Sequence, residues 1–178
     1  TRAIDRINGG CKAGMTVRDC NKAALKNWGY EPHNGKTFKM DGKDMTFDDI
    51  LLDMESKEGD WWKARSEWVN AKNEYDTVGH FANVDERDRI MNDYKNDPFF
   101  LTNAPQADVD RAMAYEKMQQ KDKLRDTAHQ NLLNNGNKLV TQSPNYKGCI
   151  VVPIFWTGSG SKNACQLSAA DQNAARDK

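Results

Sequence analysis

The sequence predicts a mainly helical α+β fold. We expect a bundle of about five helices with a hairpin in the N-terminal half and a strand pair near the C-terminus, linked by disulfides. Three observations predict it. Apolar residues recur at helical spacing over most of residues 47–134. Asp41-Gly42 stands between two short alternating segments, which is typical of a hairpin. Four cysteines lie toward the two ends of the chain.

The length and composition predict one domain with a thin core. The 178 residues suit a single domain over residues 1–178, with core helices at about residues 47–134 and a β-rich segment at about residues 138–168. Hydrophobic residues make up 38% and charged residues 29% of the chain, but five Trp and six Phe argue against disorder. Large aromatic anchors in a thin core fit a subunit that completes its burial against a partner.

Capping residues predict where the first helices begin. Thr16, with Asp19 three residues later, forms a capping box ahead of a helix that Gly29 ends. Thr46 and Asp49 repeat this box for the next helix. We expect the first helix to bury Val17, Cys20, Ala24 and Trp28. We expect the second to bury Phe47, Ile50, Leu51 and Met54 and to end at Gly59.

The hairpin is predicted over residues 37–47. Phe38 and Met40 alternate with Lys39 and lead into Asp41-Gly42. This dipeptide is favoured in the type I′ turn, because both of its central residues need positive φ. We therefore expect two short antiparallel strands immediately before the Thr46 cap.

The sharpest pattern begins at about residue 60. Large and small residues alternate along a stripe made of Trp61, Ala64, Trp68, Ala71, Tyr75 and Val78. Such a stripe needs a facing helix with complementary small and large positions. Trp62 and Val69 widen it. We interpret the stripe as an internal helix–helix core in preference to a cofactor site or a partner groove.

Further along the chain, Pro residues mark the helix boundaries. A helix at residues 85–95 points Ile90, Met91 and Tyr94 inward and stops at Asp97-Pro98. Pro105 opens a long helix that reaches about Leu133, where Asn134-Asn135-Gly136 ends it. Leu139-Val140 and residues 149–156 are predicted strands, and Pro153 places the second at an edge or a bulge.

Charge and histidine content exclude several functions. The chain has 26 basic and 26 acidic residues and no concentrated basic face, so we expect no nucleic-acid partner. No apolar stretch approaches the roughly 20 residues of a transmembrane helix. Metal sites need clustered ligands, and no two of the three histidines, His33, His80 and His129, lie within a helical turn of each other. We expect neither a metal nor another cofactor.

The cysteines predict export. Cys11 lies close to Cys20 in sequence, and Cys149 lies close to Cys165. We expect the bridges Cys11–Cys20 and Cys149–Cys165, although bridges between the two ends of the chain are an open alternative. Disulfides persist in oxidising compartments, so we expect a periplasmic or extracellular protein. Four unpaired thiols in a cytosolic protein are the other interpretation.

One pair of residues suggests an enzyme. Cys20 at the start of a helix, followed later by Gly79-His80, resembles the order found in bacterial cell-wall thiol hydrolases of the NlpC and CHAP types. The resemblance implies that Cys20 is a nucleophile, activated by the helix dipole, and that His80 is its base. The sequence departs from these families at Asn21 and Lys22, where small residues usually stand, and helices flank His80 where a strand is expected.

The sequence favours a non-enzymatic function. We expect an exported interaction or structural protein, such as an assembly subunit, a secretion accessory or an inhibitor or immunity protein, with a protein partner or self-assembly. The candidate contact residues are Trp62, Phe99, Phe100 and Trp156. The alternative is an exported cell-wall-active thiol hydrolase that uses Cys20 and His80. A carbohydrate- or lipid-binding module is a third hypothesis, suggested only by the Trp residues.

Overall fold

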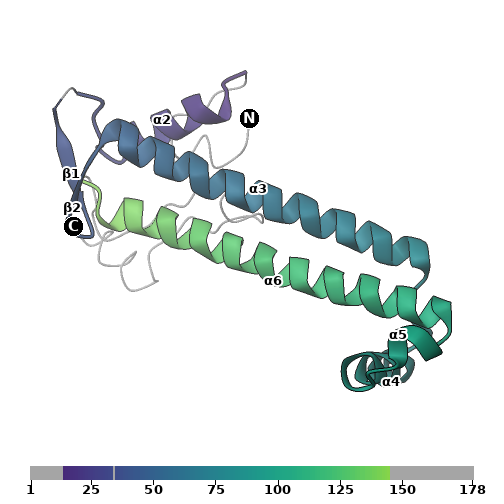
Figure 1. Cartoon of the computed structure of the whole chain (residues 1–178). Coiled ribbons are helices and arrows are strands. Elements are labelled where there is room, and N and C mark those ends of the chain that lie inside the picture. The colour runs from purple at the N-terminus through teal and green to yellow at the C-terminus, as the bar shows by residue number, and fades with distance from the viewer. Residues whose placement is uncertain (1–13, 34, 145–178) are drawn as a thin grey trace, which may run out of the picture. The chain divides into compact units, whose positions relative to one another are not determined.

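The structure is a computed structural model that describes residues 14–33 and 35–144. Over these residues it confirms a mainly helical fold of five helices and one antiparallel two-stranded hairpin (Figure 1). The predicted strand at residues 149–156, Trp156 and the other three cysteines lie outside the described residues. The elements are α2 (Val17–Asn27), β1 (Thr37–Met40), β2 (Lys43–Thr46), α3 (Phe47–Val78), α4 (Val84–Asn96), α5 (Phe100–Asn103) and α6 (Gln106–Thr141).

The chain divides into two compact units. Of the described residues, 14–33, 35–60 and 129–144 belong to one, here called the terminal unit, and residues 61–128 form the other, here called the middle unit. Both boundaries fall inside a helix. As a result α3 and α6 each contribute one end to the terminal unit and the other end to the middle unit.

In the terminal unit, the predicted N-caps at Thr16 and Thr46 are confirmed, and the reciprocal capping box is formed at Thr46. The Asp19 amide donates to Thr16 Oγ1 over 3.1 Å at the start of α2. At the start of α3 the bonds are reciprocal, with the Asp49 amide donating to Thr46 Oγ1 and the Thr46 amide to Asp49 Oδ2. The predicted buried face of α2 is wrong at Val17, and Cys20 is only half-buried. Val17 is exposed, because the buried face of α2 is made by Asn21, Ala24, Leu25 and the following Trp28.

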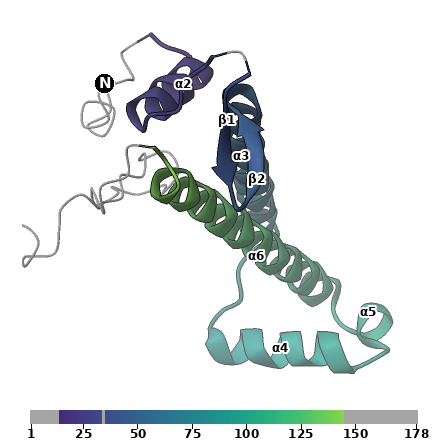
Figure 2. The ribbon, with the colours of Figure 1, turned by 90° about the vertical axis from the view of Figure 1, so that its left-hand side faces the viewer.

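The hairpin is confirmed, and its turn is fastened to the end of α6. Thr37 pairs with Thr46 and Met40 with Lys43, and Asp41 and Gly42 have φ of 53° and 78°, as a type I′ turn requires. The Gln142 side chain donates to Asp41 Oδ1 over 2.7 Å and accepts from the Asp41 amide over 2.8 Å. Figure 2 shows α2, the hairpin and the adjoining ends of α3 and α6 gathered together.

Tyr30 lies at the centre of this unit. Its side chain is fully buried, its ring meets Phe38 edge-on at 5.1 Å, and its hydroxyl donates to the backbone carbonyl of Leu139. This hydrogen bond joins the segment after α2 to the last turns of α6. The apolar core around it contains Leu25, Met40, Phe47, Ile50, Leu51, Met54, Leu132, Leu139 and Val140.

Gly59 does not end a helix, contrary to the sequence prediction. The helix expected to stop there and the one expected to start at residue 60 are a single helix, α3. A glycine inside a helix costs roughly 1 kcal/mol relative to alanine. Burial on both sides of Gly59 offsets that cost, because Met54, Glu58 and Trp61 are all buried.

The predicted end of α6 and the predicted strand at Leu139-Val140 are also wrong. The helix continues through Asn134-Asn135-Gly136 to Thr141. Leu132, Asn135, Gly136, Leu139 and Val140 are all buried and share one helical face. Tertiary burial of this face therefore overrides the local preference of Asn and Gly for a turn.

The middle unit contains its own small core. Asn83 caps α4 by accepting from the Glu86 amide over 2.8 Å, and Asp97 ends it as predicted. Ile90 and Met91 are buried, and Tyr94 packs against the same cluster. The cluster is completed by Phe100, Val109 and Ala112 from α5 and α6.

We expect Gly59→Ala to stabilise the protein by roughly 0.5–1 kcal/mol, because alanine restricts the unfolded chain and favours the helix. A Cβ at Gly59 would have no neighbouring atom within 4 Å, so no clash opposes the gain. Urea unfolding measures the change in free energy. The matched control is Gly42→Ala, which we expect to destabilise because φ is +78° there. A destabilised Gly59→Ala variant would contradict a continuous α3.

We expect Tyr30→Phe to lower the free energy of unfolding by about 1–2 kcal/mol, because the buried Leu139 carbonyl loses its side-chain donor. Burial raises the pKa of Tyr30 above its ordinary value. The protonated hydroxyl therefore contributes fully below the ordinary tyrosine pKa of about 10, and its contribution falls as pH rises above that value. Urea unfolding at about pH 8 and about pH 11 should show the difference between the two proteins narrowing. Equal stability at the lower pH would refute this role.

Candidate functional site

Exposed apolar side chains are concentrated in the middle unit. Of the large exposed apolar residues that the structure describes, only Val17 and Leu52 belong to the terminal unit. The middle unit carries Trp62, Val69, Val78, Val84, Phe99, Leu101, Met113 and Leu124. Exposed apolar side chains that gather in one part of a protein mark a candidate site of interaction. The middle unit is therefore the candidate functional region.

The predicted stripe of α3 makes the seam with α6 inside this unit. Trp61 and Ala71 are buried, and Tyr75 lies with its ring centroid 5.4 Å from that of Tyr115. Trp68 faces α6 as well, with the Arg125 guanidinium 4.2 Å above its ring. At the end of the stripe Val78 is exposed. These contacts support an internal helix–helix core. In the heptad repeat of α3, labelled a to g, Trp61, Trp68 and Tyr75 occupy position a, and Ala64 and Ala71 occupy position d.

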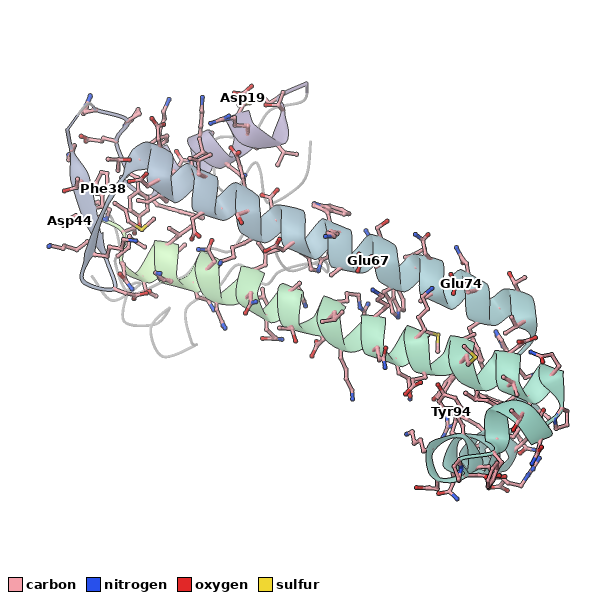
Figure 3. The ribbon with its side chains drawn as sticks, in the orientation of Figure 1. Asp19, Phe38, Asp44, Glu67, Glu74 and Tyr94 are labelled. Carbon is pink, nitrogen blue, oxygen red and sulfur yellow. The ribbon has the colours of Figure 1, made fainter. Side chains whose placement is uncertain are left out.

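One flank of this seam is neutralised by ion pairs. Lys121 Nζ lies 3.2 Å from Glu67 Oε2, and Lys117 Nζ lies 3.0 Å from both carboxylate oxygens of Glu74. Both glutamates belong to α3 at g positions of its heptads (Figure 3). We call this side the ion-paired flank. An open groove of about 840 Å³ runs along it, lined by Asn73, Glu74, Thr77, Met113, Lys117 and Gln120 among others.

The opposite flank of α3 is positively charged. Arg65 and Lys72 occupy the e positions, and Trp62 and Val69 occupy the neighbouring b positions. The Arg65 guanidinium lies 5.7 Å from the Trp61 ring and 5.4 Å from the Trp62 ring. Lys72 Nζ lies 5.6 Å from the Trp68 ring. We call these four residues, Trp62, Arg65, Val69 and Lys72, the cationic flank.

Neither cation of this flank has a carboxylate partner within the described part of the chain. Asp122, on α6, is held by Arg125 at 2.5 Å. Asp76, one heptad after Val69, is held by His80 at 2.5 Å. The cationic flank thus keeps two exposed positive charges over indole rings, next to exposed apolar surface.

An aromatic cluster closes the end of the seam around His80. Its ring is stacked on Tyr75 with centroids 4.7 Å apart and an angle of 8°. Phe81 packs edge-on against Tyr115, and the Phe81 amide donates to the Tyr75 hydroxyl over 3.3 Å. This arrangement gives the Gly79-His80-Phe81 segment a packing role at the turn that follows α3.

Cys20 is bonded in a disulfide, and no free cysteine occurs among the described residues. Its partner lies outside those residues, so the predicted pairings stay predictions. A sulfur held in a disulfide supplies no thiolate nucleophile. The Cys20–His80 pair therefore stays a prediction that requires a reduced Cys20, and the described contacts of His80 are those with Asp76 and Tyr75.

The predicted contact residues fall in different environments. Trp62 is 46% exposed and Phe99 is 63% exposed, so both are available to a partner. Phe100 is only 5% exposed and belongs to the core of the middle unit. Sequence analysis did not identify Arg65 and Lys72. The sequence feature that could have identified them is their seven-residue spacing beside the aromatic stripe. This spacing can be recognised only after the heptad positions of α3 are assigned.

No group of three or more His, Cys, Asp or Glu side chains that could hold a metal ion occurs in the described part. None of the helices described here has the length and apolarity needed to cross a membrane. Comparisons with protein-family models, curated proteins and solved structures found no match. Function is therefore inferred from the residues of this chain alone.

We expect Phe100→Ala to destabilise the middle unit by about 3 kcal/mol, because it leaves a cavity among Ile90, Met91 and Val109. The neighbouring substitution Phe99→Ala is the matched control, and it should change stability by no more than about 0.5 kcal/mol. Urea unfolding combined with hydrogen exchange at the Ile90 amide measures both effects. Equal losses in the two variants would contradict the assignment of Phe100 to the core and Phe99 to the surface.

Proposed function

We propose that the chain is an exported, non-enzymatic interaction protein that binds another protein through its middle unit. Within this class it acts as an assembly subunit, a secretion accessory or an inhibitor or immunity protein. The observation that carries the proposal is the set of exposed apolar side chains of the middle unit, among which Trp62 has the Arg65 guanidinium 5.4 Å from its ring. Exposed aromatic and aliphatic residues beside charges are typical of a protein-binding surface.

The disulfide at Cys20 supports export. Structural disulfides form and persist in the periplasm and outside the cell, whereas cytosolic reductants keep most thiols reduced. The four cysteines of the sequence form an even set that can pair completely.

The contacts of His80 support a structural role for this residue. Its ring is fixed by the Asp76 carboxylate and by stacking on Tyr75. A histidine that is held by two residues of the preceding helix, α3, contributes to the rigidity of the middle unit. This rigidity favours binding, since a preorganised surface loses little conformational entropy on association.

Site-specific photocrosslinking in the cells that produce the protein tests this proposal. A photoreactive phenylalanine analogue replaces Trp62 in one variant and Lys26, an exposed residue of α2, in a control. We expect a discrete protein adduct from position 62, in the fraction outside the cytoplasm, and none from position 26. Alkylation of the same sample without reductant should leave all four cysteines unmodified.

Two outcomes would reject the proposal. Adducts of equal yield from both positions would show that contact at Trp62 is non-specific. Free, readily alkylated cysteines in a chain recovered from the cytoplasm would exclude an exported, disulfide-bonded protein.

A further inference from the structure

We infer that the cationic flank of α3 is the docking site for an amphipathic helix of the protein partner, one that carries carboxylates at seven-residue spacing. This inference rests on the proposed function and names the chemistry of the partner. It is drawn from an asymmetry of charge between the two sides of α3 and from the shared spacing of Trp62, Arg65, Val69 and Lys72.

The asymmetry lies between the e and g positions of α3. In coiled coils these positions flank the seam on opposite sides and decide which helices pair. The g residues Glu67 and Glu74 are neutralised by lysines of α6. The e residues Arg65 and Lys72 lie over indole rings of their own helix and form no ion pair with a described residue. Within the described residues, one flank of α3 thus forms ion pairs with another helix, and the other flank does not.

The spacing specifies a helix as the partner. Arg65 and Lys72 are seven residues apart, which is about 10.5 Å along a helix axis. Trp62 and Val69 have the same spacing and form a parallel apolar row. A partner helix with an apolar stripe next to a row of Asp or Glu matches both rows at once. A flexible polyanion would match the charges but leave Trp62 and Val69 uncovered.

The indole rings restrain the two cationic side chains before a partner binds. A guanidinium or ammonium held over an indole face is restrained without being neutralised, since the ring carries no net charge. Arg65 and Lys72 therefore lose less side-chain freedom when they pair with carboxylates than unrestrained side chains would. The partner also covers Trp62, which is 46% exposed, and Val69, which is 37% exposed.

The test uses the full disulfide-bonded chain and two synthetic helical peptides of about three heptads. Both peptides carry a leucine stripe; one has Glu and the other Lys in the adjacent row at seven-residue spacing. Tryptophan fluorescence measures binding. We expect the Glu peptide to bind at least about tenfold more tightly than the Lys peptide. The double variant R65E/K72E should reverse this preference, and circular dichroism should confirm that the variant stays folded.

A matched control separates the flank from net charge. The double variant K63E/K123E makes the same change in charge within the middle unit, at two exposed lysines outside the cationic flank. It should keep the preference for the Glu peptide. Equal binding of both peptides to the unchanged chain would overturn the inference, as would loss of the preference in K63E/K123E.

Other occupants give different results. Tighter binding to phosphatidylglycerol vesicles than to the Glu peptide, abolished in R65E/K72E, would assign the flank to a lipid surface and overturn the inference. Concentration-dependent self-association abolished in R65E/K72E would assign it to a second copy, with the same consequence. If the peptides are not distinguished while Trp62 still crosslinks a protein, this inference fails and the proposed function stands. If Trp62 crosslinks nothing, the proposed function is rejected, and the inference that rests on it is rejected as well.

Discussion

The surface of the middle unit depends on the aromatic seam between α3 and α6. Trp61, Trp68 and Tyr75 occupy the positions of α3 that face α6, and Arg125 closes over Trp68 at 4.2 Å. Once these large side chains fix which face of α3 points inward, helix geometry assigns every other residue to a flank. The ion-paired flank and the cationic flank are both consequences of this one packing choice.

The same seam explains why so much apolar surface is exposed. On α6 no residue between Ala114 and Leu132 is buried; over that interval the side chains that meet α3 include Lys117, Lys121 and Arg125. Exposed ion pairs contribute little to stability, typically below 1 kcal/mol each. The alkyl stems of these side chains cover part of the aromatic stripe while their charges stay in water. The seam therefore buries little apolar surface, and a third helix packed along α3 would bury more.

Local sequence signals were reliable wherever a few neighbouring residues decide the conformation. The helix caps at Thr16 and Thr46 satisfy nearby backbone amides, and the Asp41-Gly42 turn is set by its own two residues, so sequence predicts all three. The prediction failed at Gly59 and at Asn134-Asn135-Gly136, where long-range burial overrides a local preference for ending the helix. For the candidate site, exposure of Trp62 and Phe99 agreed with expectation. Phe100 was expected to be exposed but is buried. The sequence alone does not show which of two adjacent aromatic residues α4 and α6 will cover.

The two units compensate for a small apolar content in different ways. In the terminal unit polar side chains take up interior positions, since buried Asn21 donates to buried Glu58 over 3.0 Å and Asn135 donates to Asp53 over 2.9 Å. Such bonds fix the register of α2, α3 and α6, because a shifted helix would leave these groups buried and unpaired. The middle unit has no counterpart among its described buried residues, which are all apolar, and it leaves several aromatic and aliphatic side chains exposed, Trp62 and Val69 among them. Buried polar residues whose hydrogen bonds are made within the unit need no partner. Covering Trp62 and Val69 with another surface, in contrast, lowers the free energy, because it removes their apolar surface from water.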